Sequence, residues 1–132
     1  MSLTTHSMSP LLQVFDMPTS IRYYRDTLGF AVIATSGPGD DYYWAMLRLG
    51  TATLMLNTAY GTDQRPSNPD ASRVAAHADT CLYFGCENAD EVYAHLQAQG
   101  CTADKPMTSH YGMRQVYTKD PDGFVLCFQH AV

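Results

Sequence analysis

"DMPTSIRYYRDTLGF" (residues 16–30) has a counterpart later in the chain, "ENADEVYAHLQAQGC" (residues 87–101). The two stretches are 71 residues apart, and each begins with an acidic residue and carries a glycine near its end, Gly29 or Gly100. Polar residues favour helix N-termini, and glycine commonly ends a helix at the position after its C-cap. Each stretch is therefore predicted to be a helix, and the chain to contain an internal repeat.

Local signals support both helices. Pro18 is suited to a first helical turn, and Asn88 with Glu91 has the spacing of a capping box. The residues expected to face the core are Ile21, Tyr24 and Leu28 in the first helix, and Val92, Leu96 and Tyr93 in the second.

Strand-like runs surround each helix in the same order. The first helix follows a strand-like run at 11–15 and precedes runs at 31–35, 42–50 and 51–57. The second helix follows a run at 80–85 and precedes a weaker run at 101–105 and two further runs at 113–119 and 124–130. Hairpins are indicated at 49–51 and at the Asp-Pro-Asp-Gly turn, 120–123. The sequence thus predicts an α+β fold of two βαβββ modules.

The modules are expected at 9–58 and 78–132, within one structural domain overall. A polar segment rich in Pro, Asn and Asp, 59–77, is expected to link them, and "ASRVAAHA" (71–78) suggests a short helix there. Residues 1–8 are expected to be a disordered lead-in.

Composition excludes several classes of function. The net charge is −5 and the eight Lys and Arg are scattered singly, which argues against binding nucleic acid or an acidic membrane surface. No run is long enough to span a membrane, and no secretory signal is visible. The four cysteines lack C-x-x-C spacing, so a cytoplasmic protein with reduced thiols is expected.

Several motifs together resemble the vicinal oxygen chelate superfamily, which includes glyoxalase I, bleomycin-resistance proteins, fosfomycin-resistance enzymes and extradiol dioxygenases. They are "VFDMPTSIRYYRDTLGF" (14–30), "LRLGTATLML" (47–56), "YGMRQVYTKDPDGF" (111–124) and the second helix with Gly100. The resemblance implies curved mixed sheets around a shared cleft, and a homodimer whose second subunit often completes that cleft.

The resemblance also implies where a divalent metal would be held in an enzyme of this family. The four corresponding positions carry Ser9, Met55, Cys81 (or a neighbour of it) and Cys127. Serine and methionine are poor ligands for Mg, Mn, Ni or Fe(II), so no metal and no cofactor are expected. A site for a soft ion such as Cu(I) or Zn, bound by the two thiols together with Met55, stays open.

Strand alternation predicts which side chains line the cleft. The expected ligand-binding residues are Gln13, Trp44, Met55, Asn57, Cys81, Tyr83, Arg114, Cys127 and Gln129. His110 and Tyr111 are expected beside Arg114 at the cleft mouth. His6, His77, His95 and His130 are interpreted as surface residues, although a slipped register would bring His77 or His130 towards the cleft.

Three functions remain open from the sequence. The leading hypothesis is a metal-free binding protein, as in the bleomycin-resistance branch, that sequesters an aromatic or amphipathic molecule and so acts in antibiotic resistance. The alternative is an enzyme: a glyoxalase-like lyase or dioxygenase with displaced metal ligands, or a thiol enzyme with Cys127 or Cys81 as nucleophile. The third is a purely structural or regulatory dimer.

Overall fold

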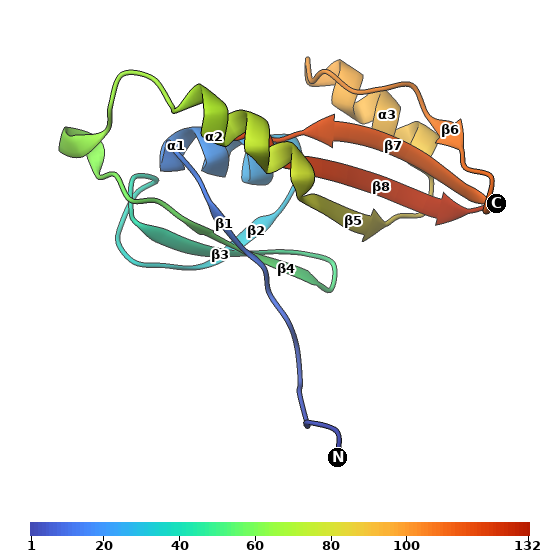
Figure 1. Ribbon diagram of the computed structural model, residues 1–132, viewed down its shortest axis with the longest axis horizontal. Helices are drawn as coiled ribbons and strands as arrows, with labels where there is room; N and C mark the ends of the chain where they lie inside the picture. Colours follow the sequence, from blue (N-terminus) through green and yellow to red (C-terminus); the bar gives the residue numbers. More distant parts are fainter. The chain divides into compact units, whose positions relative to one another are not determined.

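The chain forms two compact units, Met1–Arg65 and Pro66–Val132, and the computed structural model describes all of residues 1–132. Each unit is a four-stranded mixed sheet with a helix between its first two strands (Figure 1). The predicted α+β class and the repeated β-α-β-β-β order are confirmed. The boundary between the units falls inside segment 59–77. None of the helices combines the length and the apolar composition needed to cross a membrane.

The first unit has the strand order β1-β4-β3-β2, with β1 parallel to β4 and the other neighbours antiparallel. Its elements are β1 (Leu11–Gln13), α1 (Met17–Ile21), a π-helical continuation (Arg22–Thr27), β2 (Ala31–Thr35), β3 (Trp44–Leu49), β4 (Ala52–Asn57) and a short 3-10 helix (Thr62–Gln64).

The first helix begins and ends as its sequence predicts, but changes pitch on the way. The Asp16 carboxylate accepts a hydrogen bond from the Thr19 backbone N–H at 3.2 Å, and Gly29 closes the segment with a φ of 90°. Between these ends the backbone widens to π-helical spacing, with Leu28 N–H donating to Tyr23 O at 3.1 Å. The wider turn breaks the 3.6-residue repeat, so Leu28, predicted to face the core, is only half-buried.

The second unit repeats the arrangement with the strand order β5-β8-β7-β6, in which β5 is parallel to β8. Its elements are α2 (Ala71–Ala76), a 3-10 turn (His77–Asp79), β5 (Cys81–Gly85), α3 (Ala89–Ala98), β6 (Met107–Thr108), β7 (Met113–Lys119) and β8 (Val125–Ala131).

Two local predictions in this unit have different outcomes. The short helix expected at 71–78 is present as α2, and the Asp70 carboxylate accepts from the backbone N–H groups of Ser72 and Arg73. The weak strand expected at 101–105 is wrong. There only Ala103 forms an isolated bridge, and the edge strand β6 begins after Pro106, whose missing N–H limits strand pairing.

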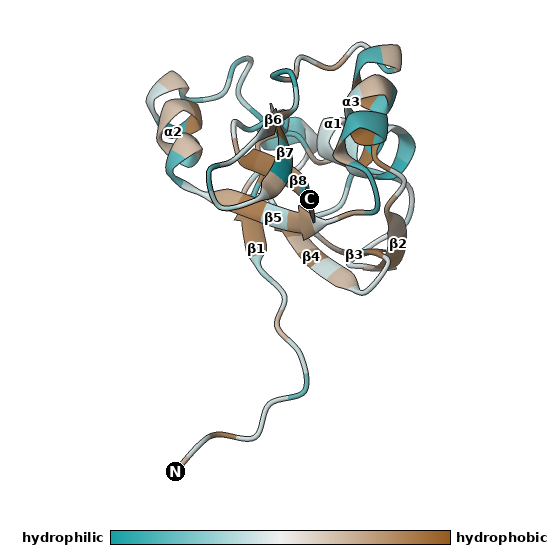
Figure 2. Cartoon of the chain, turned by 90° about the vertical axis from the view of Figure 1, so that its right-hand side faces the viewer, coloured by the Kyte–Doolittle hydropathy of each residue, from teal (hydrophilic) through white to brown (hydrophobic).

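Alternation along the strands gives each sheet one strongly buried set of side chains. In the first unit Leu12, Leu47 and Leu56 are at most 3% exposed. In the second, α3 packs on β7 and β8, where Leu96 of the helix and Val116 and Leu126 of the strands are fully buried. Much of α3 away from these strands is hydrophilic (Figure 2). The other side of each sheet is more polar and carries all of the residues expected to bind a ligand except Arg114.

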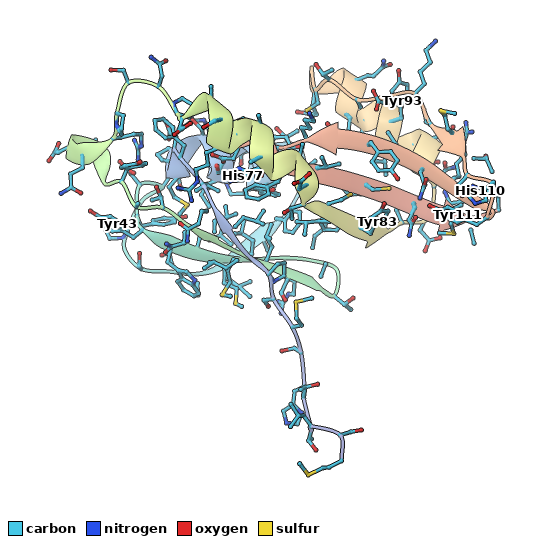
Figure 3. All side chains as sticks on the ribbon, in the orientation of Figure 1. Tyr43, His77, Tyr83, Tyr93, His110 and Tyr111 are labelled. Atoms are coloured by element: carbon cyan, nitrogen blue, oxygen red, sulfur yellow. The ribbon has the colours of Figure 1, made fainter.

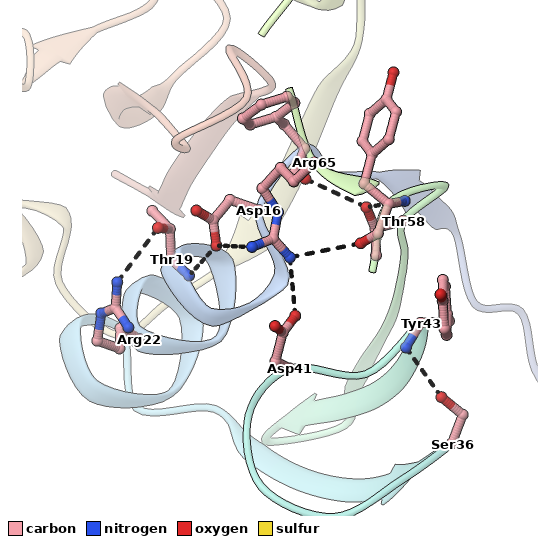
Figure 4. A network of polar contacts seen from close by, with 10 residues as sticks. Asp16, Thr19, Arg22, Ser36, Asp41, Tyr43, Thr58 and Arg65 are labelled. Carbon is pink, nitrogen blue, oxygen red and sulfur yellow. Dashed lines mark hydrogen bonds and ion pairs between the residues drawn. The ribbon is translucent and has the colours of Figure 1, made fainter. Parts of the chain in front are cut away.

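A polar contact anchors the segment that follows β4 (Figure 4). Arg65 donates from Nη2 to Asp41 Oδ1 at 2.8 Å, and its Nη1 lies 3.9 Å from Oδ1 of Asp16, the N-cap of α1. Its side chain is only 14% exposed, so the ion pair is partly shielded from water. Arg65 therefore ties the end of the first unit to the start of α1 and to the β2–β3 loop.

Candidate functional site

In the first unit, four of the predicted ligand-binding residues lie on one face of the sheet. Backbone register places Gln13, Asn57 and Trp44 in one row across β1, β4 and β3, with Met55 in the next row. Asn57 Nδ2 donates to Gln13 Oε1 at 3.3 Å. These side chains are all half-buried. We call this set, together with Met46, which is opposite Met55, the amide face.

Ser9 lies beside this face but already has a partner. Its hydroxyl is hydrogen-bonded to the hydroxyl of Thr53, which lies two residues before Met55 on β4. A neutral hydroxyl pair with a thioether nearby offers no anionic ligand to a cation.

In the second unit, the predicted residues Cys81, Tyr83, Cys127 and Gln129 also lie on one face, opposite the side covered by α3. Register places Tyr83, Cys127 and Tyr117 in one row, and Gly85, Gln129 and Gln115 in the next. We call the face formed by these two rows the tyrosine face.

Hydrogen bonds join the tyrosine face into one network. The Tyr83 and Tyr117 hydroxyls lie 3.3 Å apart, and Tyr117 donates to Gln115 Oε1 at 3.4 Å. Gln115 Nε2 donates at 2.9 Å both to Gln129 Oε1 and to the hydroxyl of Tyr111. Tyr111 lies in the turn before β7, at the end of the unit where β8 finishes (Figure 3). A chain of neutral donors and acceptors thus crosses the sheet.

Arg114, predicted to bind a ligand, does not belong to this group. It lies on the opposite side of β7, where its guanidinium donates to both carboxylate oxygens of Asp90 on α3, at 2.8 and 3.2 Å, and to Thr108. This pairing holds the pKa of Asp90 below its usual range. Gln115 takes the position facing the network. Strand alternation along β7 could have predicted this placement, because Gln115 and Tyr117 are opposite Gln129 and Cys127.

Cys127 is fully buried within the tyrosine face. Burial raises the pKa of its thiol to about 11, and a hydrogen bond with Tyr117 offsets this only in part. The pKa values of Cys81, Cys86 and Cys101 are also raised by burial. A thiol that stays protonated at neutral pH is a poor nucleophile and a poor metal ligand.

The histidines that a slipped register would bring to the site are engaged elsewhere in the second unit. His77 stacks on Phe124, with ring centroids 4.0 Å apart, and its Nδ1 lies 2.7 Å from Asp122 O. His130 Nδ1 accepts from the backbone N–H of Ala89 at the start of α3. His110 makes an edge contact with Tyr111.

The side chains do not fit a hard divalent metal. The four positions implied by the family resemblance supply a hydroxyl, a thioether and two thiols, of which Ser9 is hydrogen-bonded and Cys127 buried and protonated. No group of three or more His, Cys, Asp or Glu side chains comes together in a way that could hold a metal ion.

The family and the solved structures to which this chain is similar share its fold. The family model of the glyoxalase/bleomycin resistance protein/dioxygenase superfamily matches residues 5–128. A glyoxalase/bleomycin resistance protein from Streptomyces sp. CB03234 is 25% identical, with a TM-score of 0.64 over 92% of this chain and 97% of that chain. No curated protein matches significantly.

Two other solved structures have different biochemical descriptions. TnmS3, an antibiotic binding protein from Streptomyces sp. CB03234, has a TM-score of 0.67 at 23% identity, covering 98% of this chain and 100% of that one. A lactoylglutathione lyase from Agrobacterium tumefaciens has a TM-score of 0.69 at 17% identity, covering 96% of this chain and 94% of that one. At these identities the similarity is one of fold.

Proposed function

Because this chain belongs to the glyoxalase/bleomycin resistance protein/dioxygenase superfamily, we propose that it is a metal-free binding protein that sequesters a small aromatic or amphipathic molecule. The observation that carries this proposal is Cys127. At a position where the family's enzymes place a metal ligand, this chain has a buried thiol with a pKa raised to about 11, hydrogen-bonded to a tyrosine.

The two polar sheet faces support a binding role. Amides and hydroxyls on a largely apolar, aromatic surface are typical of sites that hold an organic molecule by shape and a few hydrogen bonds. The amide face offers Gln13, Asn57 and Trp44, and the tyrosine face offers Tyr83 and Gln129. The antibiotic binding protein TnmS3 has the same fold, which is consistent with this use of it.

The alternative is that the protein is an enzyme, either one that depends on a metal or one that uses a cysteine thiol as nucleophile. A glyoxalase-like lyase or a dioxygenase needs a metal held by ligands other than those implied by the resemblance. A thiol enzyme needs a base or a cation beside its cysteine to form the thiolate. Tyr83 and Tyr117 flank Cys127 in the strand register and burial raises its pKa, so the thiol form is not favoured. The metal form is not favoured because Ser9 and Met55 are poor ligands for a hard cation.

We include a homodimer in the proposal, since proteins of this family often complete the cleft with a second subunit. Light scattering after gel filtration measures the mass in solution. A monomer that still binds ligand would remove the dimer from the proposal and leave sequestration intact.

The first experiment measures retained metal. The protein is incubated separately with Mn, Fe(II), Co, Ni, Cu and Zn, desalted, and analysed by elemental mass spectrometry. We expect far less than one metal per chain. About one tightly held metal per chain, or metal-dependent isomerisation of a hemithioacetal, would overturn the proposal in favour of an enzyme.

The second experiment measures binding of a panel of antibiotics and aromatic metabolites by calorimetry. Tyr83→Ala, on the tyrosine face, is expected to weaken binding of any ligand found. Tyr93→Ala is the matched control, because Tyr93 lies on α3, where its hydroxyl accepts from Gln97 (Figure 3). Failure of the whole panel to bind would contradict the proposal.

A further inference from the structure

The hydrogen-bond network of the tyrosine face has a direction. Tyr117 donates to Gln115 Oε1, so the Tyr117 oxygen can accept the proton of Tyr83. On the other side of Gln115, both hydrogens of its Nε2 are used, one towards Gln129 and one towards Tyr111. Every bond from Tyr83 to Gln115 and on to Tyr111 and Gln129 is therefore donated in the same sense.

This direction leaves donors at one end of the network. Gln129 uses its carbonyl oxygen as an acceptor, so both hydrogens of its amide nitrogen remain for another partner. Tyr111 also accepts from Gln115, so its hydroxyl proton remains as well, on a side chain that is 61% exposed. Two neutral donors thus flank one buried amide.

A space without a side chain lies beside these donors. Gly85 is opposite Gln129 in the parallel β5–β8 register, and a Cβ built on it would meet nothing within 4 Å. The φ angle of Gly85 is not in the positive range, so a larger residue would suit the backbone there. Tyr83, two residues earlier on the same face, is 54% exposed, and we call the open space over Gly85 beside it the notch.

The two rows of the tyrosine face carry no charged side chain. The row of Gly85, Gln129 and Gln115 ends at Met107 of β6, and the next row holds only Tyr83, Cys127 and Tyr117. Of the two cations of β7, Lys119 pairs with Val125 at the far end of the strands and Arg114 faces α3, while Glu87 follows Gly85 by two residues. A carboxylate or phosphate would therefore meet no Lys or Arg on these rows, and an ammonium would face the donors of Gln129 and Tyr111 rather than acceptors.

We infer that the notch at Gly85 is a subsite for an uncharged, planar aromatic group, whose carbonyl or equivalent neutral acceptor receives hydrogen bonds from Gln129 and Tyr111. This inference rests on the proposed binding function and gives it a ligand class and an orientation. Gly85 determines specificity by leaving room for a flat ring on the strand, and Gln115 positions the two donors.

The test uses a matched series of small probes: 1-indanone, which carries a carbonyl, indane, which has no oxygen, 1-indanol, and indane-1-carboxylate. Affinities are measured by protein NMR shift titration with the full chain. The readout is the affinity ratio of 1-indanone to indane, which removes the shared contribution of the ring. We expect 1-indanone to shift the amides of β5 and β8, and indane-1-carboxylate to bind more weakly than 1-indanone.

Three variants and one control locate the effect. Gln129→Leu keeps the volume and removes the donor, so the ratio should fall about fivefold to tenfold, the effect of one net hydrogen bond. Tyr111→Phe should lower it by a smaller factor of about two to five. Gly85→Val fills the notch and should weaken 1-indanone and indane alike. Ala98→Val, which adds similar volume at an exposed position of α3, should change neither.

The outcomes separate this inference from the proposed function. If Gly85→Val and Gln129→Leu leave probe binding unchanged while panel ligands bind the wild type, the subsite is wrong and sequestration stands. If 1-indanol or indane-1-carboxylate binds better than 1-indanone, the donor direction is wrong. If neither the probes nor the panel binds, both proposals fail. Circular dichroism and NMR dispersion check that each variant is folded.

Discussion

Cys127 lies directly opposite Tyr117 in the antiparallel pair of β7 and β8, and the tyrosine hydroxyl is hydrogen-bonded to the buried thiol. The pKa values of both groups are raised. The hydrogen bond with Tyr83 is the largest cause of the raised pKa of Tyr117, followed by burial. Burial is the largest cause of the raised pKa of Cys127. Both side chains thus stay neutral at physiological pH, which is why this row of the tyrosine face suits a neutral ligand better than a metal.

The first prediction concerns the reactivity of Cys127. With a pKa of about 11, only about one Cys127 thiol in ten thousand is ionised at neutral pH. We expect it to be the slowest of the four cysteines to react with iodoacetamide, measured by peptide mass spectrometry. Half-buried Cys86 and Cys101 are internal controls in the same unit. Alkylation of Cys127 at the rate of a free thiol would contradict this prediction and support the hypothesis of a thiol enzyme.

The second prediction is a loss of stability at high pH. The unfolded Cys127 thiol loses its proton near pH 9 and the folded one near pH 11, so between these values the unfolded chain binds fewer protons and stability falls as the pH rises. The contribution of the neutral thiol to the free energy of unfolding is fully present below pH 9 and has decreased by about 2 kcal/mol at pH 11.

Comparison with Cys127→Ala isolates this effect from other groups that titrate at high pH. The difference in unfolding free energy between wild type and variant, from urea titrations, should shrink by about 2 kcal/mol over this range. A difference that stays constant from pH 9 to pH 11 would show that the thiol has the same pKa in both states.

The third prediction concerns the ion pair between Arg65 and Asp41, which are 14% and 27% exposed and 2.8 Å apart. A double-mutant cycle with Arg65→Met and Asp41→Asn, followed by urea unfolding, should give a coupling of about 1 kcal/mol, because the pair is partly shielded from water. The cycle of Arg25→Met and Asp40→Asn is the control, since that pair is more exposed, at 36% and 41%. We expect weaker coupling there, and equal coupling would contradict a special role for Arg65.

Local chemistry in the sequence was sufficient to predict most of the fold. The caps at Asp16 and Asn88, the glycines at 29 and 100, and the Asp-Pro-Asp-Gly turn each fix the backbone over a few residues. The π-helical turn after Ile21 was not predictable, because periodicity arguments assume regular α-helical spacing.

The residues of the site were predictable where the alternation of side chains along a strand was used. The prediction was wrong where that alternation was not applied. Steps of two along a strand predict the faces of four residues, Gln13, Asn57, Tyr83 and Gln129. Trp44, expected to point in from the neighbouring strand, lies in the row of Gln13 and Asn57. Arg114 is expected at the cleft mouth with Tyr111, but a step of one residue from Gln115 places its side chain on the α3 side, paired with Asp90. The hydrogen bond from Gln115 to Tyr111, four residues earlier, required the structure.

The fourth prediction concerns Gly123, where the β7–β8 turn meets α2. Its φ is +87°, and a Cβ added there would lie 2.5 Å from the carbonyl oxygen of Val74 on α2. Gly123→Ala therefore has two costs: an unfavourable left-handed conformation, worth about 1 to 2 kcal/mol, and a collision with backbone that cannot rotate away.

Gly100→Ala is the matched control, because Gly100 has a φ of +77° in the same unit and nothing within 4 Å of its added Cβ. We expect Gly100→Ala to cost about 1 kcal/mol in urea unfolding and Gly123→Ala at least 1 kcal/mol more. Because the clash is with Val74, hydrogen exchange should accelerate in α2 (Ala71–Ala76) for Gly123→Ala and not for Gly100→Ala. Equal costs, with α2 equally protected in both variants, would mean that α2 does not rest on this turn in solution.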